Sequence, residues 1–278
     1  MQLAIELNPN ELFFWEPIAL TGTPFEINRV VLLMFLASAL CILFFVLGAR
    51  RGALVPRGIQ NLAEMAYLFV RNNIAIDVIG PEGTKYASYL TALFYFIFFA
   101  NLLEIVPGIN FPITSRMAIP AVLGFLSWVI FITVGIMKQG PISYFKNTLF
   151  PSGVPWPIYI LLAPIELFST FIVRPFTLAI RLLANMMAGH VLLTIFFLFT
   201  ADLVAPEISL PLGIVTAIVA AGLILFELLV ISIQAYIFTT LTAFYISEAI
   251  HGHGEEHEEH DKEGERPEAQ RETEGIAA

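Results

Sequence analysis

The sequence predicts an all-α polytopic membrane protein with five membrane-crossing helices and one amphipathic surface helix. The last two spans are expected to be long, tilted and paired as an antiparallel hairpin. Hydrophobic residues make up 58% of the 278 residues and charged residues only 13%, more apolar surface than a soluble domain of this length could bury. Few segments alternate polar and apolar residues as the strands of a membrane barrel do, so helices are favoured.

The expected spans are apolar runs long enough to cross a hydrocarbon core. They cover residues 30–47, 88–106, 118–136, 158–200 and 212–250. Arg50, Arg51 and Arg57 follow the first span at once. Because cytoplasmic connections carry an excess of basic residues, the N-terminus is expected outside. Residues 1–29 form an outer segment without the basic start or the cleavage site of a signal peptide.

Residues 58–77 have an amphipathic pattern, with Ile59 and Leu62 on one side and Asn61 and Glu64 on the other. This pattern predicts a helix lying on the inner membrane surface. The alternative is a core-facing helix of a soluble insertion.

The last two apolar runs are too long for upright spans. The stretch from Pro164 to Phe199 would be about 54 Å long at about 1.5 Å per residue, against a hydrocarbon core of about 30 Å. These helices must tilt or break, and Pro175 offers a kink in the first of them. The hairpin is expected to turn outside the membrane at residues 202–209.

Residues 30–250 are predicted to form a single membrane domain, followed by an acidic, disordered cytoplasmic tail at 251–278. The histidines of this tail are an alternative metal site, but no apolar scaffold fixes their geometry. The sequence has no nucleotide-binding glycine loop and no nucleic-acid motif, and no cofactor or metal is expected.

Arg181 lies inside the fourth predicted span, in the stretch Arg-Leu-Leu-Ala-Asn-Met-Met-Ala-Gly-His that ends at His190. Arginine cannot lose its charge, and an ionisable group at membrane depth costs at least about 3 kcal/mol. Arg181 is more than a dozen residues from either end of its run, which argues against the alternative that its side chain reaches the headgroups. It is therefore a candidate functional residue.

Several other polar residues fall at matching levels of the predicted hairpin. If the turn is centred near residues 207–208, antiparallel pairing puts His190 level with Glu227, Arg181 with Gln234 and Glu166 with Glu248. Asn185 follows Arg181 by one turn, whereas His190 points to the opposite side of the helix. Ordinary packing hydrogen bonds are the alternative for Asn185 and Gln234.

Histidine and buried glutamate can relay protons near neutral pH, and a fixed cation repels them. The arrangement therefore allows proton transfer along two separate aqueous paths. A moving carboxylate that Arg181 could deprotonate has no candidate in the chain, which implies another subunit. Glu104, near the end of the second span, is interpreted as an interfacial acid, with a role in proton access as the alternative.

The motif from Arg181 to His190, together with Glu227 and the Ile-Gln-Ala-Tyr-Ile-Phe stretch around Gln234, resembles subunit a of the F-type ATP synthase. The run Ser-Thr-Phe-Ile-Val-Arg-Pro ending at Pro175 resembles actinobacterial versions. The resemblance implies that Arg181 faces the carboxylates of the subunit c ring, with Asn185 and Gln234 beside it. His190 and Glu227 would line the outer half-channel, and Glu166 the inner one.

The resemblance also implies a membrane stator subunit without an ATP site. Its expected partners are the c-ring, the peripheral-stalk subunit b, the rest of the synthase and membrane lipid, in a bacterial plasma membrane. Two other classes are alternatives. A secondary transporter would show an internal repeat, which the sequence lacks, and a structural scaffold would need no charges at depth. The choice between H⁺ and Na⁺ should lie mainly in the ring.

The predicted orientation can be tested by cysteine labelling. Ile5→Cys should react with an impermeant reagent from outside and Gln270→Cys from inside, because five crossings put the termini on opposite sides. Cys41→Ala provides the cysteine-free background. Labelling of both positions from one side would contradict the five-crossing topology.

Overall fold

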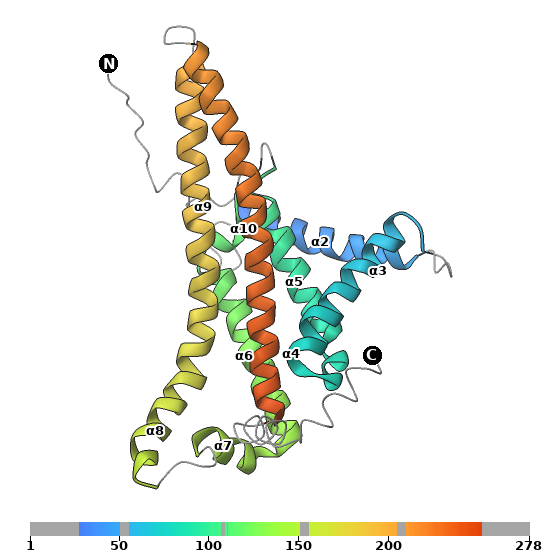
Figure 1. The fold of residues 1–278 in the computed structure, drawn as a ribbon, viewed down its shortest axis with the longest axis vertical. Coiled ribbons are helices and arrows are strands. Elements are labelled where there is room, and N and C mark those ends of the chain that lie inside the picture. Colours follow the sequence, from blue (N-terminus) through green and yellow to red (C-terminus); the bar gives the residue numbers. More distant parts are fainter. Residues whose placement is uncertain are drawn as a thin grey trace, which may run out of the picture. The chain divides into compact units, whose positions relative to one another are not determined.

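The computed structural model describes residues 28–50, 56–106, 109, 111–150, 156–204 and 210–251. Every regular element in this part of the chain is helical, which confirms the predicted all-α class (Figure 1). The described residues fall into two compact units. The first contains residues up to Phe125 and Phe176–Ala243, and the second contains Leu126–Pro175 and the residues from Phe244 onward.

Four helical segments of the described chain are long and apolar enough to cross a membrane. They are Arg29–Ala49, Ala118–Gln139, Pro157–Thr200 and Ile214–His251. The helix at the second predicted span, α5 (Ala87–Leu102), has only 16 residues, or about 24 Å. The chain is thus a multi-pass membrane protein, and a fifth crossing stays a prediction.

The first unit begins with α2 (Arg29–Ala49), whose N-terminus is capped by the side chain of Asn28. It continues through α3 (Ile59–Val70), the π-helical segment η1 (Arg71–Ile76), α4 (Asp77–Ile79), the 3₁₀ segment η2 (Pro81–Lys85) and α5. The 3₁₀ turn η3 (Ile113–Ser115) precedes α6 (Ala118–Gln139). A core between α2, α5 and η3 is built from apolar side chains, including Leu33, Ala100 and Phe111.

The predicted surface helix corresponds to α3, η1 and α4. Its small residues Ala63 and Ala66 are buried, while large apolar residues such as Leu62 and Met65 stay more than half exposed. Gly48 of α2 sits against the Cβ of Ala63, so a larger residue at position 48 would not fit. The exposed apolar side chains of α3 are available to lipid or to another protein, and its position on a membrane surface stays a prediction.

The second unit contains the C-terminal part of α6, then α7 (Pro141–Leu149), α8 (Trp156–Phe168) and the π-helical segment η4 (Ser169–Val173). Helix α9 (Arg174–Val204) starts at its boundary, and the last residues of α10 (Leu210–His251) belong to it. Helix α7 was not among the predicted elements. The run predicted from 158 to 200 is one continuous helical segment, Pro157–Thr200, and the π-helical segment η4 lies inside it, shortly before Pro175.

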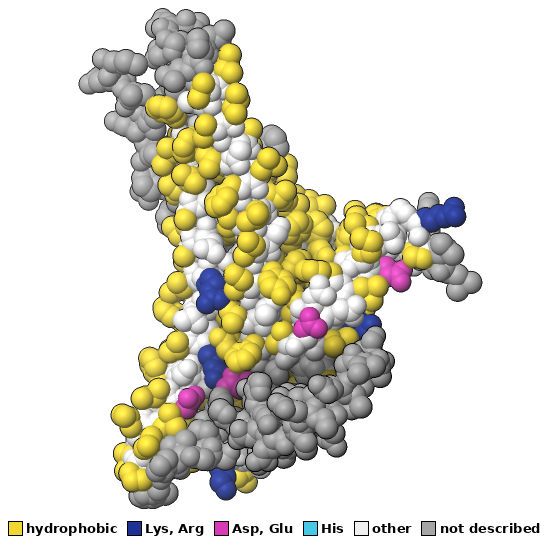
Figure 2. All heavy atoms as spheres, in the orientation of Figure 1, with side chains coloured by type: hydrophobic (Ala, Val, Ile, Leu, Met, Phe, Trp, Pro, Cys, Tyr) yellow, Lys and Arg dark blue, Asp and Glu magenta, His cyan; other side chains and the backbone are white. Residues whose placement is uncertain are grey.

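Large apolar side chains cover much of the long helices, and charged side chains are sparse on the face drawn in Figure 2. Such a surface would aggregate in water and is suited to lipid and to neighbouring membrane subunits. The predicted turn at 202–209 lies largely, and the tail at 252–278 wholly, outside the described residues.

Candidate functional site

Arg181 lies on an exposed face of α9. Ala184, Asn185 and Ala188 share that face and are exposed as well, because residues three, four and seven positions apart lie on one side of a helix. The opposite face, with Leu182 and Met186, is fully buried. The sequence thus presents a permanent cation among small side chains that leave room for another helix.

Asn185 connects this face to α10. Its Nδ2 donates a hydrogen bond to Oε1 of Gln234 at 2.5 Å. Gln234 itself is completely buried. The two amide residues that were predicted beside Arg181 are therefore in contact with each other, one helical turn from the guanidinium.

A buried group of ionisable side chains lies on the other side of α9. His190 is 5% exposed and Glu104 is 3% exposed, and His190 Nδ1 is 3.5 Å from Oε1 of Glu104. This distance fits an ion pair but is long for a hydrogen bond. The ring of Phe111 packs edge-on against the imidazole, with centroids 5.8 Å apart.

Glu227 of α10 joins the same group. Its side chain is 3% exposed and its carboxylate packs directly against Gly189, where any side chain would overlap it. The carboxylates of Glu227 and Glu104 are also close enough to interact electrostatically. Because Gly189 has no side chain, the carboxylate of Glu227 has room next to His190.

Two further polar side chains extend the group, Asn101 of α5 and Thr114 of η3. Asn101, one turn before Glu104, is fully buried and its Oδ1 accepts a hydrogen bond from the hydroxyl of Thr114. Both oxygens of Glu104 and Oε1 of Glu227 are buried without a hydrogen-bond partner among the described residues. We call Asn101, Glu104, His190 and Glu227 the acid–histidine cluster.

The chemistry of the acid–histidine cluster follows from its burial. An unsatisfied buried carboxyl group costs about 1–3 kcal/mol or more, so such a group is not retained for packing alone. Imidazole and carboxyl groups at this spacing can pass a proton from one to the next. The cluster can therefore accept and release protons inside an otherwise apolar unit.

Glu104 was interpreted first as an interfacial acid, and its burial beside His190 favours the alternative, a role in proton access. The one sequence signal for this contact was the polar pair Asn101 and Glu104 at helical spacing at the end of an apolar run. Such a pair marks one helix face and does not identify the partner across from it.

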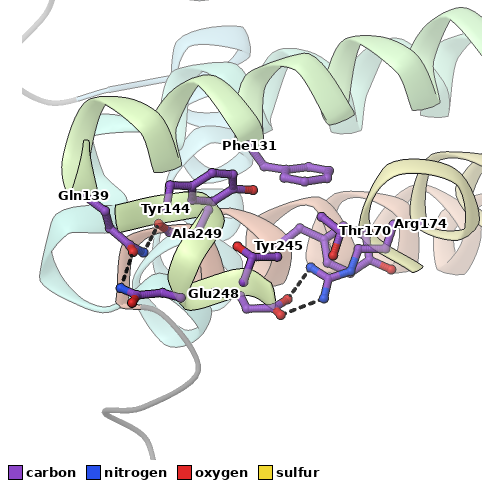
Figure 3. Close-up of a pocket in the computed structure, with 10 residues that line it drawn as sticks. Phe131, Gln139, Tyr144, Thr170, Arg174, Tyr245, Glu248 and Ala249 are labelled. Carbon is purple, nitrogen blue, oxygen red and sulfur yellow. Dashed lines mark hydrogen bonds and ion pairs between the residues drawn. The ribbon is translucent and has the colours of Figure 1, made fainter. Parts of the chain in front are cut away.

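The remaining candidate residues, Glu166 and Glu248, lie in the second unit. Glu248 is paired with Arg174 through two hydrogen bonds of 2.5 and 2.7 Å (Figure 3), and Glu166 is half-buried on α8. Arg174 was not a predicted site residue, because it stands next to Pro175 where a kink was the expected feature. No group of three or more metal-binding side chains occurs within the described ranges.

These features define a class, a multi-pass helical membrane protein with ionisable groups buried between its spans. Comparison with known sequences gives the particular family. The family model described as ATP synthase A chain matches residues 31–247. Subunit a of Frankia alni is 46% identical over 242 residues, which cover 87% of this chain and 83% of that protein.

Two more relatives agree. Subunit a of Rhodococcus erythropolis is 43% identical over 242 residues, covering 86% of this chain and 88% of its own length. Subunit a of Parafrankia sp. is 49% identical over 212 residues, covering 76% and 72%. The chain belongs to the ATP synthase subunit a family, a family of membrane-sector subunits. Frankia and Rhodococcus are actinobacteria, in agreement with the predicted resemblance.

Gly189→Ala tests the contact between α9 and Glu227. The added methyl group would meet the flexible end of a side chain, so we expect the carboxylate to move and the fold to persist. ATP synthesis by the assembled complex should fall by a factor of about three to ten, since a displacement of about 1 Å can cost up to a hundredfold.

Gly222→Ala is the matched control, because its added methyl group meets no atom within 4 Å. In a Glu227→Ala background, Gly189→Ala should have no additional effect. An equal loss in both backgrounds, or a loss of the chain from the membrane, would show that Gly189 serves packing alone.

Proposed function

We propose that the chain is the proton-conducting stator subunit of an F-type ATP synthase, with two offset half-channels that meet a rotating ring of c subunits. Proton flow through them would drive rotation and ATP synthesis at catalytic sites on other subunits. The observation that carries this proposal is the exposed position of Arg181 in a membrane span of a subunit a family member.

An exposed arginine at this depth cannot be left facing lipid. Contact with the hydrocarbon costs at least about 3 kcal/mol, and the small neighbours Ala184 and Ala188 keep the face low enough for another helix to approach. A partner that offers a carboxylate at the same depth removes this cost. The carboxylate ring of subunit c is such a partner.

Arg181 would have two tasks in this arrangement. Its permanent charge would repel protons and so keep the two half-channels from joining. It would also favour the ionised form of each ring carboxylate that passes, because opposite charges attract strongly where water is scarce. Asn185 and Gln234 would fix the local geometry through their hydrogen bond.

The acid–histidine cluster is proposed as part of the outer half-channel. Its members lie on the side of α9 opposite Arg181 and within reach of one another, which suits a relay toward the ring. Glu166 and the region of Glu248 are assigned to the inner side. The proposal includes subunit b as a partner, a plasma-membrane location, an external N-terminus and a cytoplasmic tail from 251 to 278.

Arg181→Ala should abolish both ATP synthesis and ATP-driven proton pumping while the complex stays assembled. Passive proton leakage should persist or rise, since protonated ring carboxylates could then pass the gap unchecked. The measurement is acidification of inverted membrane vesicles, with the amount of subunit a and c-ring determined in the same sample.

Two results distinguish the alternatives for Arg181. Loss of the chain from the membrane would indicate a folding role. Pumping at near-normal rate in an assembled Arg181→Ala complex would falsify the proposed mechanism.

Glu104→Gln and Glu227→Gln test the outer half-channel. Each change keeps the side-chain volume but removes a titratable group, so each should slow proton-driven ATP synthesis by about 10²-fold or more, the usual contribution of a proton-transfer group. Glu64→Gln, which alters a carboxylate on the exposed face of α3, is the control. Normal synthesis rates in both cluster variants would exclude a relay through these residues.

A further inference from the structure

A short segment between α5 and α6, residues 111–115, contacts two members of the acid–histidine cluster. The ring of Phe111 packs edge-on against the imidazole of His190, with centroids 5.8 Å apart. The hydroxyl of Thr114 donates a hydrogen bond to Oδ1 of Asn101. With its oxygen bound in this way, the amide has its nitrogen turned to the other side. The 111–115 segment therefore sets the orientation of one ring and one amide of the cluster.

The 111–115 segment is itself held firmly. The hydroxyl of Ser115 donates to the carbonyl of Pro112 at 2.8 Å, and the backbone N–H of Ser115 reaches the same carbonyl at 3.1 Å. Phe111 and Ile113 are 1% and 0% exposed and belong to the apolar core between α2, α5 and η3. These contacts keep Phe111 and Thr114 in one fixed relation to each other.

Arg29 ties this region to α2. Its Nη2 donates to the carbonyl of Ile109 at 2.7 Å, which joins positions 80 residues apart in the sequence. The side chain of Ile109 packs against the same apolar core as Phe111. A hydrogen bond from a charged donor is stronger than one between neutral groups. The start of α2 thus fixes the connection that leads into the 111–115 segment.

Neither the stability of α2 nor the topology explains a half-buried arginine at this position. Arg29 is the first residue of α2, where a cation opposes the helix macrodipole, and the side chain of Asn28 already caps the helix. Under the predicted orientation this end of α2 is external, whereas basic residues favour the cytoplasmic side. A contact across the chain is therefore the better explanation for Arg29.

We propose that Arg29 is a positioning residue of the outer proton path, which acts through Phe111 and Thr114 on His190 and Asn101. This inference rests on the proposed function. Proton transfer needs its donor and acceptor within about 2.6–3.2 Å of each other, or one water apart. A displacement of about 1 Å can cost up to about a hundredfold in rate. Arg29 is not a proton carrier itself, because its guanidinium keeps its proton.

A purely structural role would produce the same contacts, but the two roles differ in their kinetics. A weaker fold lowers the number of assembled complexes and hence the maximal rate, and it leaves the proton requirement of each complex unchanged. A displaced relay slows the delivery of protons from outside. Each complex then needs a higher external proton concentration for half-maximal synthesis.

The test uses the assembled synthase in proteoliposomes. ATP synthesis is measured at a fixed electrical potential as the proton concentration on the outer side of the chain is varied. Arg29→Ala should raise the half-maximal proton concentration about tenfold. Arg29→Lys keeps a charged donor on a long side chain and should raise it less than about threefold. Arg50→Ala removes an exposed arginine at the other end of α2 and, as the matched control, should leave it unchanged.

Arg29 also takes part in a further interaction, so its coupling to the 111–115 segment is measured as well. Phe111→Leu combined with Thr114→Val removes both contacts to the cluster. In that background Arg29→Ala should add less than about twofold, because residues that act through one another are not additive. If the combined background does not assemble, Thr114→Val alone decides, and the effect of Arg29→Ala should shrink there by at least about half.

An unchanged effect of Arg29→Ala in these backgrounds, or no effect in the wild type, would overturn the proposal. A lower maximal rate at an unchanged half-maximal proton concentration would establish a folding role and overturn it too. If Arg29→Ala is lost from the membrane, Arg29→Gln takes its place, and loss of that variant as well would also establish a folding role. Arg181→Ala on the same preparation separates this inference from the proposed function, because Arg29 can be dispensable while Arg181 remains essential.

Discussion

The cost of a permanent charge in an apolar environment is the constraint on which the rest of the molecule depends. Arg181 cannot be neutralised by losing a proton and lies in the middle of a long span. That constraint accounts for the small exposed side chains around Arg181 and for its place on the face of α9 away from the buried residues. It also means that Arg181 needs a partner. In the second unit, the charge of Arg174 is instead neutralised within the chain, because Arg174 forms an ion pair with Glu248.

The two arginines therefore suit different tasks. A cation already bound to a carboxylate by two hydrogen bonds has little attraction left for a third group, so Arg174 is a poor ligand for a passing ring carboxylate. Arg181 lies on an exposed face among small residues, with its amide neighbours Asn185 and Gln234 bonded to each other. In the proposed function, only the second arrangement can attract and release carboxylates in turn.

The sequence predicted the helical class and the long spans because hydropathy over twenty residues is a strong signal. It also predicted separate environments for Arg181 and His190 from helical spacing alone. Contacts between segments that are far apart in the sequence were harder to predict. The hairpin register placed Glu248 level with Glu166, whereas the structure pairs Glu248 with Arg174. Similarly, His190 lies beside Glu104, which follows α5. The register of a hairpin predicts which residues of its two helices lie at the same level. It does not predict a contact with a residue from a third segment. Helix α7 was missed because its nine residues, although amphipathic, are too few to stand out from the connection between two spans.

The fourth span, for which the sequence allowed either a tilt or a break, is one continuous helical segment, Pro157–Thr200, that contains the π-turn η4. Pro175 supplies no backbone donor and disfavours regular helix in the preceding turn, so the extra residue of a π-turn is tolerated there at low additional cost. Thr170 of this segment and Arg174, four residues later, line the same hollow as Glu248 (Figure 3). On a regular helix, residues four apart also lie on nearly the same side, offset by about 40°. The shared orientation of Thr170 and Arg174 therefore follows from their spacing in the sequence and does not depend on the π-turn.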